Sequence, residues 1–142
     1  YKQFHLDEPW DSEHNKKLIS RMPATFASPN RPNDGKTVYL VPVGPGTMFG
    51  GDKGLAIAEI TDGLSNTILL VEADPDRAVE WTRPEDLAYD PERPLTGLGH
   101  LRPNIFLAAF ADGSVRTVAN GVDLQVLRAL FTAAGSEEVN LQ

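Results

Sequence analysis

Acidic side chains in turns form the first pattern with chemical meaning in this sequence. Glu72, Asp74 and Asp76 alternate along "EADPD", and Asp112 opens the Asp112-Gly113 dipeptide of "FADGSVRTVA". Carboxylate oxygens supplied by loops are ligands that calcium prefers, so these acids are candidate calcium ligands. The spacing is not that of an EF-hand, and the ordinary alternative is that each acid only shapes its own turn. Calcium is the one cofactor that the pattern suggests.

Two tryptophans and a histidine are the candidate contacts for a ligand or partner. Trp10, Trp81 and His100 carry rings that can stack or hydrogen-bond, although a tryptophan more often packs in a core. The three histidines of the chain lack the H-x-x-x-H and H-E-x-x-H spacings of zinc sites. Ser65 lies in "DGLSN" rather than in a G-x-S-x-G nucleophile elbow. We therefore predict that the protein is not an enzyme and has no catalytic residues.

The composition limits the classes of partner. The 142 residues are 41% hydrophobic and 23% charged, which is typical of one folded domain spanning 1–142. A net charge of -7 argues against a binder of nucleic acid and against adsorption to anionic lipid. The absence of cysteine excludes disulfides and thiolate metal sites.

The elements that position these residues read as an α+β domain. A short helix is predicted over 11–22, with Asp11 or Ser12 as its cap and Pro23 after it. A longer helix is predicted over 123–135, capped by Asp123 and closed by Gly135, because its apolar residues recur with helical spacing. One helical turn is expected in 83–89.

A mostly antiparallel sheet is predicted between the two helices. Strands are expected over 37–43, 56–60, 67–73 and 78–82, with the strand over 67–73 central. Pro42 favours a strand end or an edge, because proline donates no ladder hydrogen bond. The residues 104–120 predict a hairpin with a type I′ turn at Asp112-Gly113. The glycine-rich segment 44–54 is expected to be a loop.

Several phrases in order along the chain resemble one family. They are "PWDSEHNKKLI" (9–19), "TVYLVPVGPGTMF" (37–49), "ITDGLSNTILLVEA" (60–73), "AVEWTRPEDLAYD" (78–90) and "FADGSVRTVANGVDLQVLRALFTAAGSEEV" (110–139). They resemble the planctomycete family of prepilin-like secreted proteins classed as a domain of unknown function. An older label compares that family with bacterial extracellular solute-binding proteins. His100 and the "F-x-DGSV" hairpin match the family's late motif, and Leu101 and Arg102 stand where that motif usually has glycines.

The resemblance implies a pseudopilin-like head, the fragment of a longer precursor whose prepilin leader and apolar N-terminal helix are absent from this sequence. It implies an extracytoplasmic location, in the periplasm or at the cell surface, and membrane contact only through that missing helix. The implied partners are other pilin-like subunits or components of a type II secretion system. No catalytic residues carry over from the family, while calcium binding by some pseudopilins supports a calcium site near Asp112.

The favoured function is therefore structural: assembly or display of an extracytoplasmic head. One alternative is a ligand- or glycan-binding module that uses Trp10, Trp81 and the glycine-rich loop. Another alternative is a hydrolase built on the acidic loops, since paired carboxylates across a cleft hydrolyse glycosides.

Overall fold

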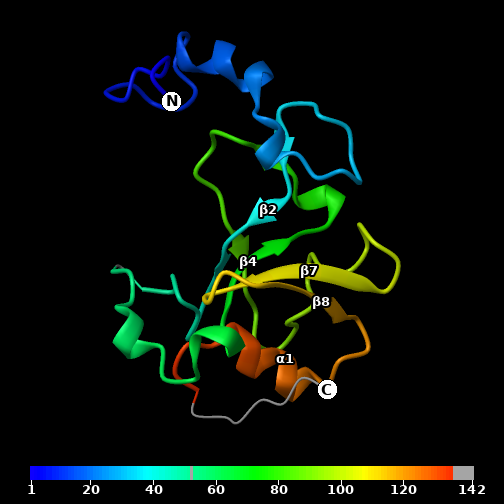
Figure 1. Ribbon diagram of the computed structural model, residues 1–142. Helices are drawn as coiled ribbons and strands as arrows, with labels where there is room; N and C mark the ends of the chain where they lie inside the picture. The colour runs from blue at the N-terminus through cyan, green and yellow to red at the C-terminus, as the bar shows by residue number, and fades with distance from the viewer. Residues whose placement is uncertain (52, 136–142) are drawn as a thin grey trace.

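The computed structural model describes residues 1–51 and 53–135 (Figure 1). Its α-helix is α1 (Leu124–Phe131). Its 3-10 helices are η1 (Asn15–Arg21), η2 (Ala24–Phe26), η3 (Ile57–Glu59), η4 (Leu64–Asn66) and η5 (Pro75–Arg77). Its strands are β1 (Lys36–Thr37), β2 (Tyr39–Leu40), β3 (Pro42–Val43), β4 (Ile68–Glu72), β5 (Val79–Glu80), β6 (Leu87–Ala88), β7 (Ile105–Phe110) and β8 (Val115–Ala119). This mixture of helices and mostly antiparallel strands confirms the α+β class.

A four-stranded antiparallel sheet in the order β2-β4-β7-β8 forms the centre of the domain. Helix α1 lies against one face of this sheet (Figure 1). Phe106, Ala108 and Phe110 of β7 point into that layer and pack with Leu127 and Leu130 of α1 in one buried cluster. The alternation in β7 follows from the strand period of two residues, so the residues between them lie on the opposite face. The predicted central position of the strand over 67–73 is confirmed by β4.

The single strand predicted over 37–43 is divided into three short strands that belong to three different sheets. β1 pairs with β5, β2 with β4, and β3 with β6. The last pair is parallel, and its ladder uses the carbonyls of Val41 and Val43, which accept from Leu87 N and Tyr89 N at 2.9 Å each. The ladder therefore requires no N–H donor at Pro42, and its expected place at a strand edge is confirmed.

Two predicted local elements are wrong. Residues 56–60 form η3 rather than a strand, because the Glu59 carboxylate accepts a hydrogen bond from Ala56 N at 2.6 Å and closes a turn. Ile57 is left 73% exposed, so the apolar alternation does not mark a buried face. Residues 83–89 contain β6 rather than a helical turn, because Leu87 pairs with β3 and is buried there. A local side-chain hydrogen bond decides the first case, and tertiary pairing overrides a weak local preference in the second.

The hairpin of β7 and β8 is confirmed, but its turn is not of type I′. Gly113 has a φ of +83°, whereas Asp112 is absent from the described non-glycine residues with positive φ, so the two positive φ values of that turn are not met. Gly113 N donates to Phe110 O at 2.9 Å, and Phe110 N donates to Ser114 O at 2.8 Å. These bonds define a three-residue loop in which the glycine forms a bulge, the next most common hairpin connection.

Both predicted helices are shorter than expected. The N-terminal one is the 3-10 helix η1, entered through Ser12, whose hydroxyl accepts from Asn15 N at 3.1 Å. The Asp123 cap of α1 is confirmed by bonds from Gln125 N and Val126 N, but the helix ends at Phe131 rather than near Gly135. Beyond it, the chain bonds to the glycine-rich loop. Across the described ranges, no helix combines the length and apolar character needed to span a membrane.

Candidate functional site

The pair Asp74–His100 is the most organised group of ionisable side chains that the structure places together. Asp74 follows β4 and is buried, with its side chain 6% exposed, whereas the His100 side chain is 80% exposed. One Asp74 oxygen accepts from His100 N at 2.6 Å, and the other lies 2.7 Å from His100 Nδ1. A buried acid thus holds both the backbone and the ring of an exposed histidine.

The segment "TGLGH" explains how His100 reaches this acid. Gly97 has a φ of +80° and Gly99 a φ of +86°, a region that glycine enters without steric cost. Gly97 O accepts from Asp74 N at 2.8 Å, and Gly99 O accepts from Asn120 Nδ2 at 2.9 Å. A Cβ on Gly99 would lie 2.2 Å from Asn120 Oδ1, so the loop requires glycine there for space as well as for conformation.

The surroundings of His100 are acidic. The Asp74 hydrogen bond, and then the Asp74 charge, raise the pKa of His100 above its ordinary value, and Asp76 adds a smaller contribution of the same sign. His100, Asp74 and Asp76 line one shallow hollow of about 460 Å³ together with Pro75 and Gly97. The candidate contact His100 and two of the four candidate calcium ligands therefore lie together.

Glu72 belongs to a separate buried ion pair. Its carboxylate accepts from Arg102 Nε at 2.5 Å and from Arg102 Nη2 at 3.1 Å. Ser28 Oγ donates to the same carboxylate at 2.7 Å, and the Asn30 side-chain oxygen, in the amide orientation that satisfies both its polar atoms, accepts from Arg102 at 2.8 Å. The Glu72 hydrogen bonds raise the pKa of Arg102. Burial, and then the Glu72 charge, raise the pKa of Tyr39, its cross-strand partner.

The Asp112 carboxylate stabilises the turn between β7 and β8. Its Oδ1 accepts from Ser114 N at 2.9 Å and from Ser114 Oγ at 2.6 Å, and its Oδ2 lies 3.5 Å from Arg116 Nη2. The hydroxyl bond from Ser114, followed by the backbone bond, holds the pKa of Asp112 below its ordinary value. Such a side-chain turn is the common use of aspartate at this position in a bend.

The four candidate calcium ligands are therefore not brought to one point. Glu72 pairs with Arg102, Asp74 with His100, and Asp112 with its own turn. In the part of the chain that the structure describes, no three His, Asp or Glu side chains are arranged to hold a metal ion. Calcium binding stays a prediction, without an assembled set of ligands in these ranges.

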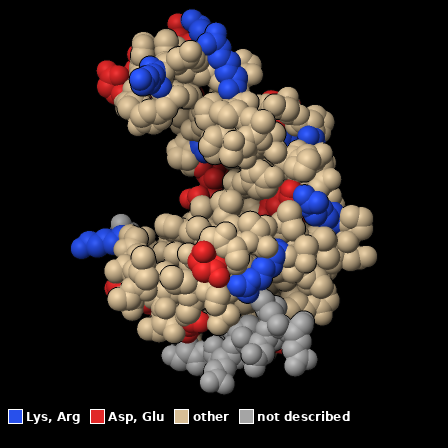
Figure 2. All heavy atoms as spheres, in the orientation of Figure 1, with Lys and Arg blue, Asp and Glu red and all other residues tan. Residues whose placement is uncertain are grey.

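Trp81 and Trp10 connect the N-terminal segment to the body. Trp81 Nε1 donates to Ile19 O at 3.0 Å, and its ring packs against Phe4 and Phe26 at centroid distances of 5.6 and 5.3 Å. The Arg83 guanidinium lies 5.8 Å from the centroid of Trp10. The N-terminal segment stands apart from the sheet at the top of Figure 1, and the surface is indented between the two in Figure 2. These contacts give both tryptophans a packing role.

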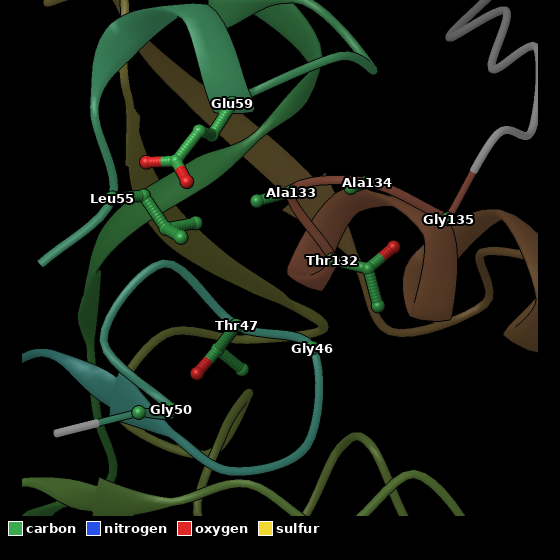
Figure 3. A pocket seen from close by; sticks show the side chains of 10 residues that line it. Gly46, Thr47, Gly50, Leu55, Glu59, Thr132, Ala133, Ala134 and Gly135 are labelled. Atoms are coloured by element: carbon green, nitrogen blue, oxygen red, sulfur yellow. The ribbon is translucent and has the colours of Figure 1, made fainter. Parts of the chain in front are cut away.

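Residues 44–50 of the glycine-rich loop fold around Thr47 and border a hollow of about 530 Å³ (Figure 3). Thr47 Oγ1 donates to Gly44 O at 2.9 Å and accepts from Gly44 N at 3.1 Å. Gly50 must be glycine, since a Cβ there would lie 2.0 Å from Gly44 O. Ala133 N donates to Gly46 O at 3.0 Å, which ties the end of the α1 segment to this loop.

The outer face of the four-stranded sheet is open and apolar. Leu70 of β4, Leu107 and Ala109 of β7, and Val115 of β8 line a hollow of about 300 Å³, with Thr25 of η2 at its rim. Val115 is 65% exposed. Ser28, which follows η2, and Arg102 both bind the Glu72 carboxylate and so cover the far end of this face. The hollow is therefore the uncovered remainder of the face opposite α1.

Sequence reasoning missed the residues around Glu72. Arg102, Ser28 and Asn30 were not singled out, although Arg102 was noted as a departure from the family's motif. The available signal was the alternation of two acids at 72 and 74 and of a histidine and an arginine at 100 and 102.

Comparisons with known proteins find a family model that matches part of the chain. Neither a curated protein nor a solved structure matches the chain significantly. Residues 136–139, the end of the last phrase that resembles the family, lie outside the described residues. Residues 41–97, less than half of the chain, match the model of a family described as "Protein of unknown function (DUF1559)", which also carries a bacterial solute-binding label.

Proposed function

We propose that this chain is the non-enzymatic, extracytoplasmic head of a pseudopilin-like assembly protein. It would bind other pilin-like subunits or secretion components through the open face of its four-stranded sheet. The observation that carries the proposal is the apolar hollow on that face, lined by Leu70, Leu107, Ala109 and Val115. The family match and its solute-binding label support the extracytoplasmic location.

An antiparallel sheet whose second face meets water normally shows polar side chains there. Here alternate residues of β4 and β7 are apolar on both faces, and the outer ones are only half-buried. Contiguous exposed apolar surface marks a contact site in a soluble protein more often than it serves folding. The outer face therefore has the composition of a surface that another protein covers.

The engagement of the acids supports a non-enzymatic role. Glu72 is held in an ion pair, and Asp112 is held in its turn. The hollow beside His100 is lined by Asp74, Pro75, Asp76, Gly97 and His100 itself, so its described lining contributes no hydroxyl or thiol nucleophile.

A crosslinking experiment in the full-length protein, in its own cell envelope, tests the proposal. A photoreactive phenylalanine replaces Leu107 on the outer face, and the matched control replaces Ile57, an apolar residue of η3 that is 73% exposed. We expect a defined crosslink to a second copy or to another envelope protein from position 107 and none from position 57. Equal crosslinking from both positions, or none from either, refutes the sheet face as the contact surface.

A second candidate function, binding of a small ligand, is favoured by the hollow at the glycine-rich loop. Glu59 and Leu55 flank it on one side and Thr132 on the other (Figure 3). Ala134 is exposed at its wall, so the Ala134→Trp variant fills the hollow without disturbing the core. A saturable isotherm with a glycan or peptide that is lost in Ala134→Trp would assign ligand binding to this hollow. An isotherm lost only in Trp81→Ala would place it near the tryptophan instead.

A further inference from the structure

The contacts of Asp74 fix which nitrogen of His100 is free. One Asp74 oxygen accepts a hydrogen bond from His100 N at 2.6 Å, and the other lies 2.7 Å from His100 Nδ1. A neutral imidazole carries one proton, and the carboxylate at 2.7 Å keeps that proton on Nδ1. The lone pair of the neutral ring is therefore on Nε2, on a side chain that is 80% exposed.

This arrangement is the one that supports a histidine as a metal ligand. A ligating histidine almost always donates its second ring N–H to a carboxylate or carbonyl, which orients the ring and strengthens the ligand. An imidazole is not needed merely to satisfy the hydrogen bonds of Asp74, because the His100 backbone N–H already donates to one of its oxygens. An asparagine at position 100 would satisfy the other through its amide.

The loop that carries His100 is rigid. Gly97 and Gly99 adopt the left-handed conformation, and each carbonyl of the pair accepts a hydrogen bond from a different part of the fold. The Gly99 backbone lies against the Asn120 amide with no room for a side chain. A ligand held in this way loses little conformational freedom when it binds a metal ion.

A second donor faces the same hollow. Asp76 lines it beside His100, and its side chain is 73% exposed. Arg77 lies 3.7 Å from Asp76, a long and exposed ion pair that leaves the carboxylate accessible. Since no three metal-ligating side chains converge in the described residues, water must complete the coordination shell.

We propose that His100 Nε2 and Asp76 form a surface site for a divalent first-row transition metal ion, with Asp74 as the positioning residue behind His100. Imidazole nitrogen with a carboxylate suits zinc, copper and nickel rather than calcium. Two protein ligands and several waters make an open, exchangeable site, to which a second molecule can add ligands. This site lies apart from the sheet face of the proposed function and does not depend on it.

Zinc titration of the whole chain tests the site, with the ring signals of all three histidines followed by NMR. We expect a saturable isotherm in which the His100 ring signals shift first. His5 and His14 are an internal comparison, because their rings stack on each other at 3.5 Å and lie in the N-terminal segment. Shifts of His5 and His14 with none of His100, or no saturable binding, would overturn the proposal.

Three variants separate ligation from structure. His100→Asn keeps an N–H donor for Asp74 and removes Nε2, so it should lose binding while its metal-free melting temperature stays near that of the native protein. Asp74→Asn offers an N–H to Nδ1 and favours the wrong tautomer, so affinity should fall about 10- to 100-fold. Asp76→Asn should weaken binding without moving the His100 titration as far as Asp74→Asn does. Unchanged zinc affinity in His100→Asn refutes the site, and in that case a change in its melting temperature assigns His100 a structural role alone.

Discussion

The buried ion pair between Glu72 and Arg102 yields the sharpest stability prediction. In Arg102→Ala the Glu72 carboxylate, 1% exposed, loses two of its three side-chain hydrogen bonds and keeps only the one from Ser28. Removal of one partner from a buried pair costs about 3–5 kcal/mol, because the other charge stays uncompensated. Arg102 is 25% exposed and Ser28 remains, so we expect the lower end, about 3 kcal/mol.

Urea unfolding at neutral pH measures this loss, and the melting temperature should fall by roughly 10 °C. The control is Arg93→Ala, which removes an exposed pair with Asp90 and should cost no more than about 1 kcal/mol. In a double-mutant cycle, Arg102→Ala with Glu72→Gln should show a coupling of about 1.5 kcal/mol or more. If Arg102→Ala costs no more than Arg93→Ala, the pair is solvated in solution and the reasoning from burial is wrong.

Four further outcomes follow from the contacts. Gly113→Ala should lower the free energy of unfolding in urea by about 1–2 kcal/mol, because a φ of +83° strains any residue with a side chain. Space is not the cause, since no atom lies within 4 Å of a Cβ at Gly113. The control Gly121→Ala, at an equally open position without positive φ, should cost clearly less. Asp123→Ala should lower stability by about 1 kcal/mol through loss of the α1 cap, while an unchanged midpoint would contradict that role. The pKa of His100 is raised above 6.5 in the folded protein. The pairing of His100 with Asp74 therefore contributes stability that is fully present below pH 6.5 and is lost as the pH rises through the folded pKa. A pH series of melting curves should show this decline in the native protein and not in His100→Asn. Calcium should leave the melting temperature within error of a chelated sample, because no three acids converge in the described residues, and a clear rise would support the predicted calcium binding.

Local chemistry was readable from the sequence where one residue decides the conformation. The Asp123 cap, the hairpin around Gly113 and the edge position of Pro42 each depend on neighbours a few residues away. The predicted type I′ turn is wrong because the Asp-Gly dipeptide alone does not show which residues form the last hydrogen-bonded pair of β7 and β8. The hydrogen bonds of Phe110 to Gly113 and Ser114 make the loop three residues long instead of two. The segment 37–43 likewise reads as one strand, since nothing local tells which partner each pair of residues will meet.

The candidate site was less predictable because its contacts are distant in the chain. Asp74 and His100 are 26 residues apart, and Glu72 and Arg102 are 30 apart. The two pairs are nevertheless related, since positions 72 and 74 alternate at the end of β4 and meet positions 102 and 100 in antiparallel order. Arg102 is therefore half of one pair in a ladder of two acids and two basic side chains.

The acid is buried in both pairs of this ladder, but the basic side chain is 25% exposed at Arg102 and 80% exposed at His100, and that difference separates their roles. The Glu72–Arg102 pair is covered by Ser28 and Asn30 and joins the N-terminal part to the sheet, so its loss should be felt in stability. In the other pair the acid is buried and the base is exposed. A substitution that keeps the Asp74 hydrogen bond, such as His100→Asn, should therefore leave stability near native while it changes what the surface can bind. Equal destabilisation by His100→Asn and Arg102→Ala would show that His100 supports the fold as much as Arg102 does, and the separation of their roles by exposure would fail.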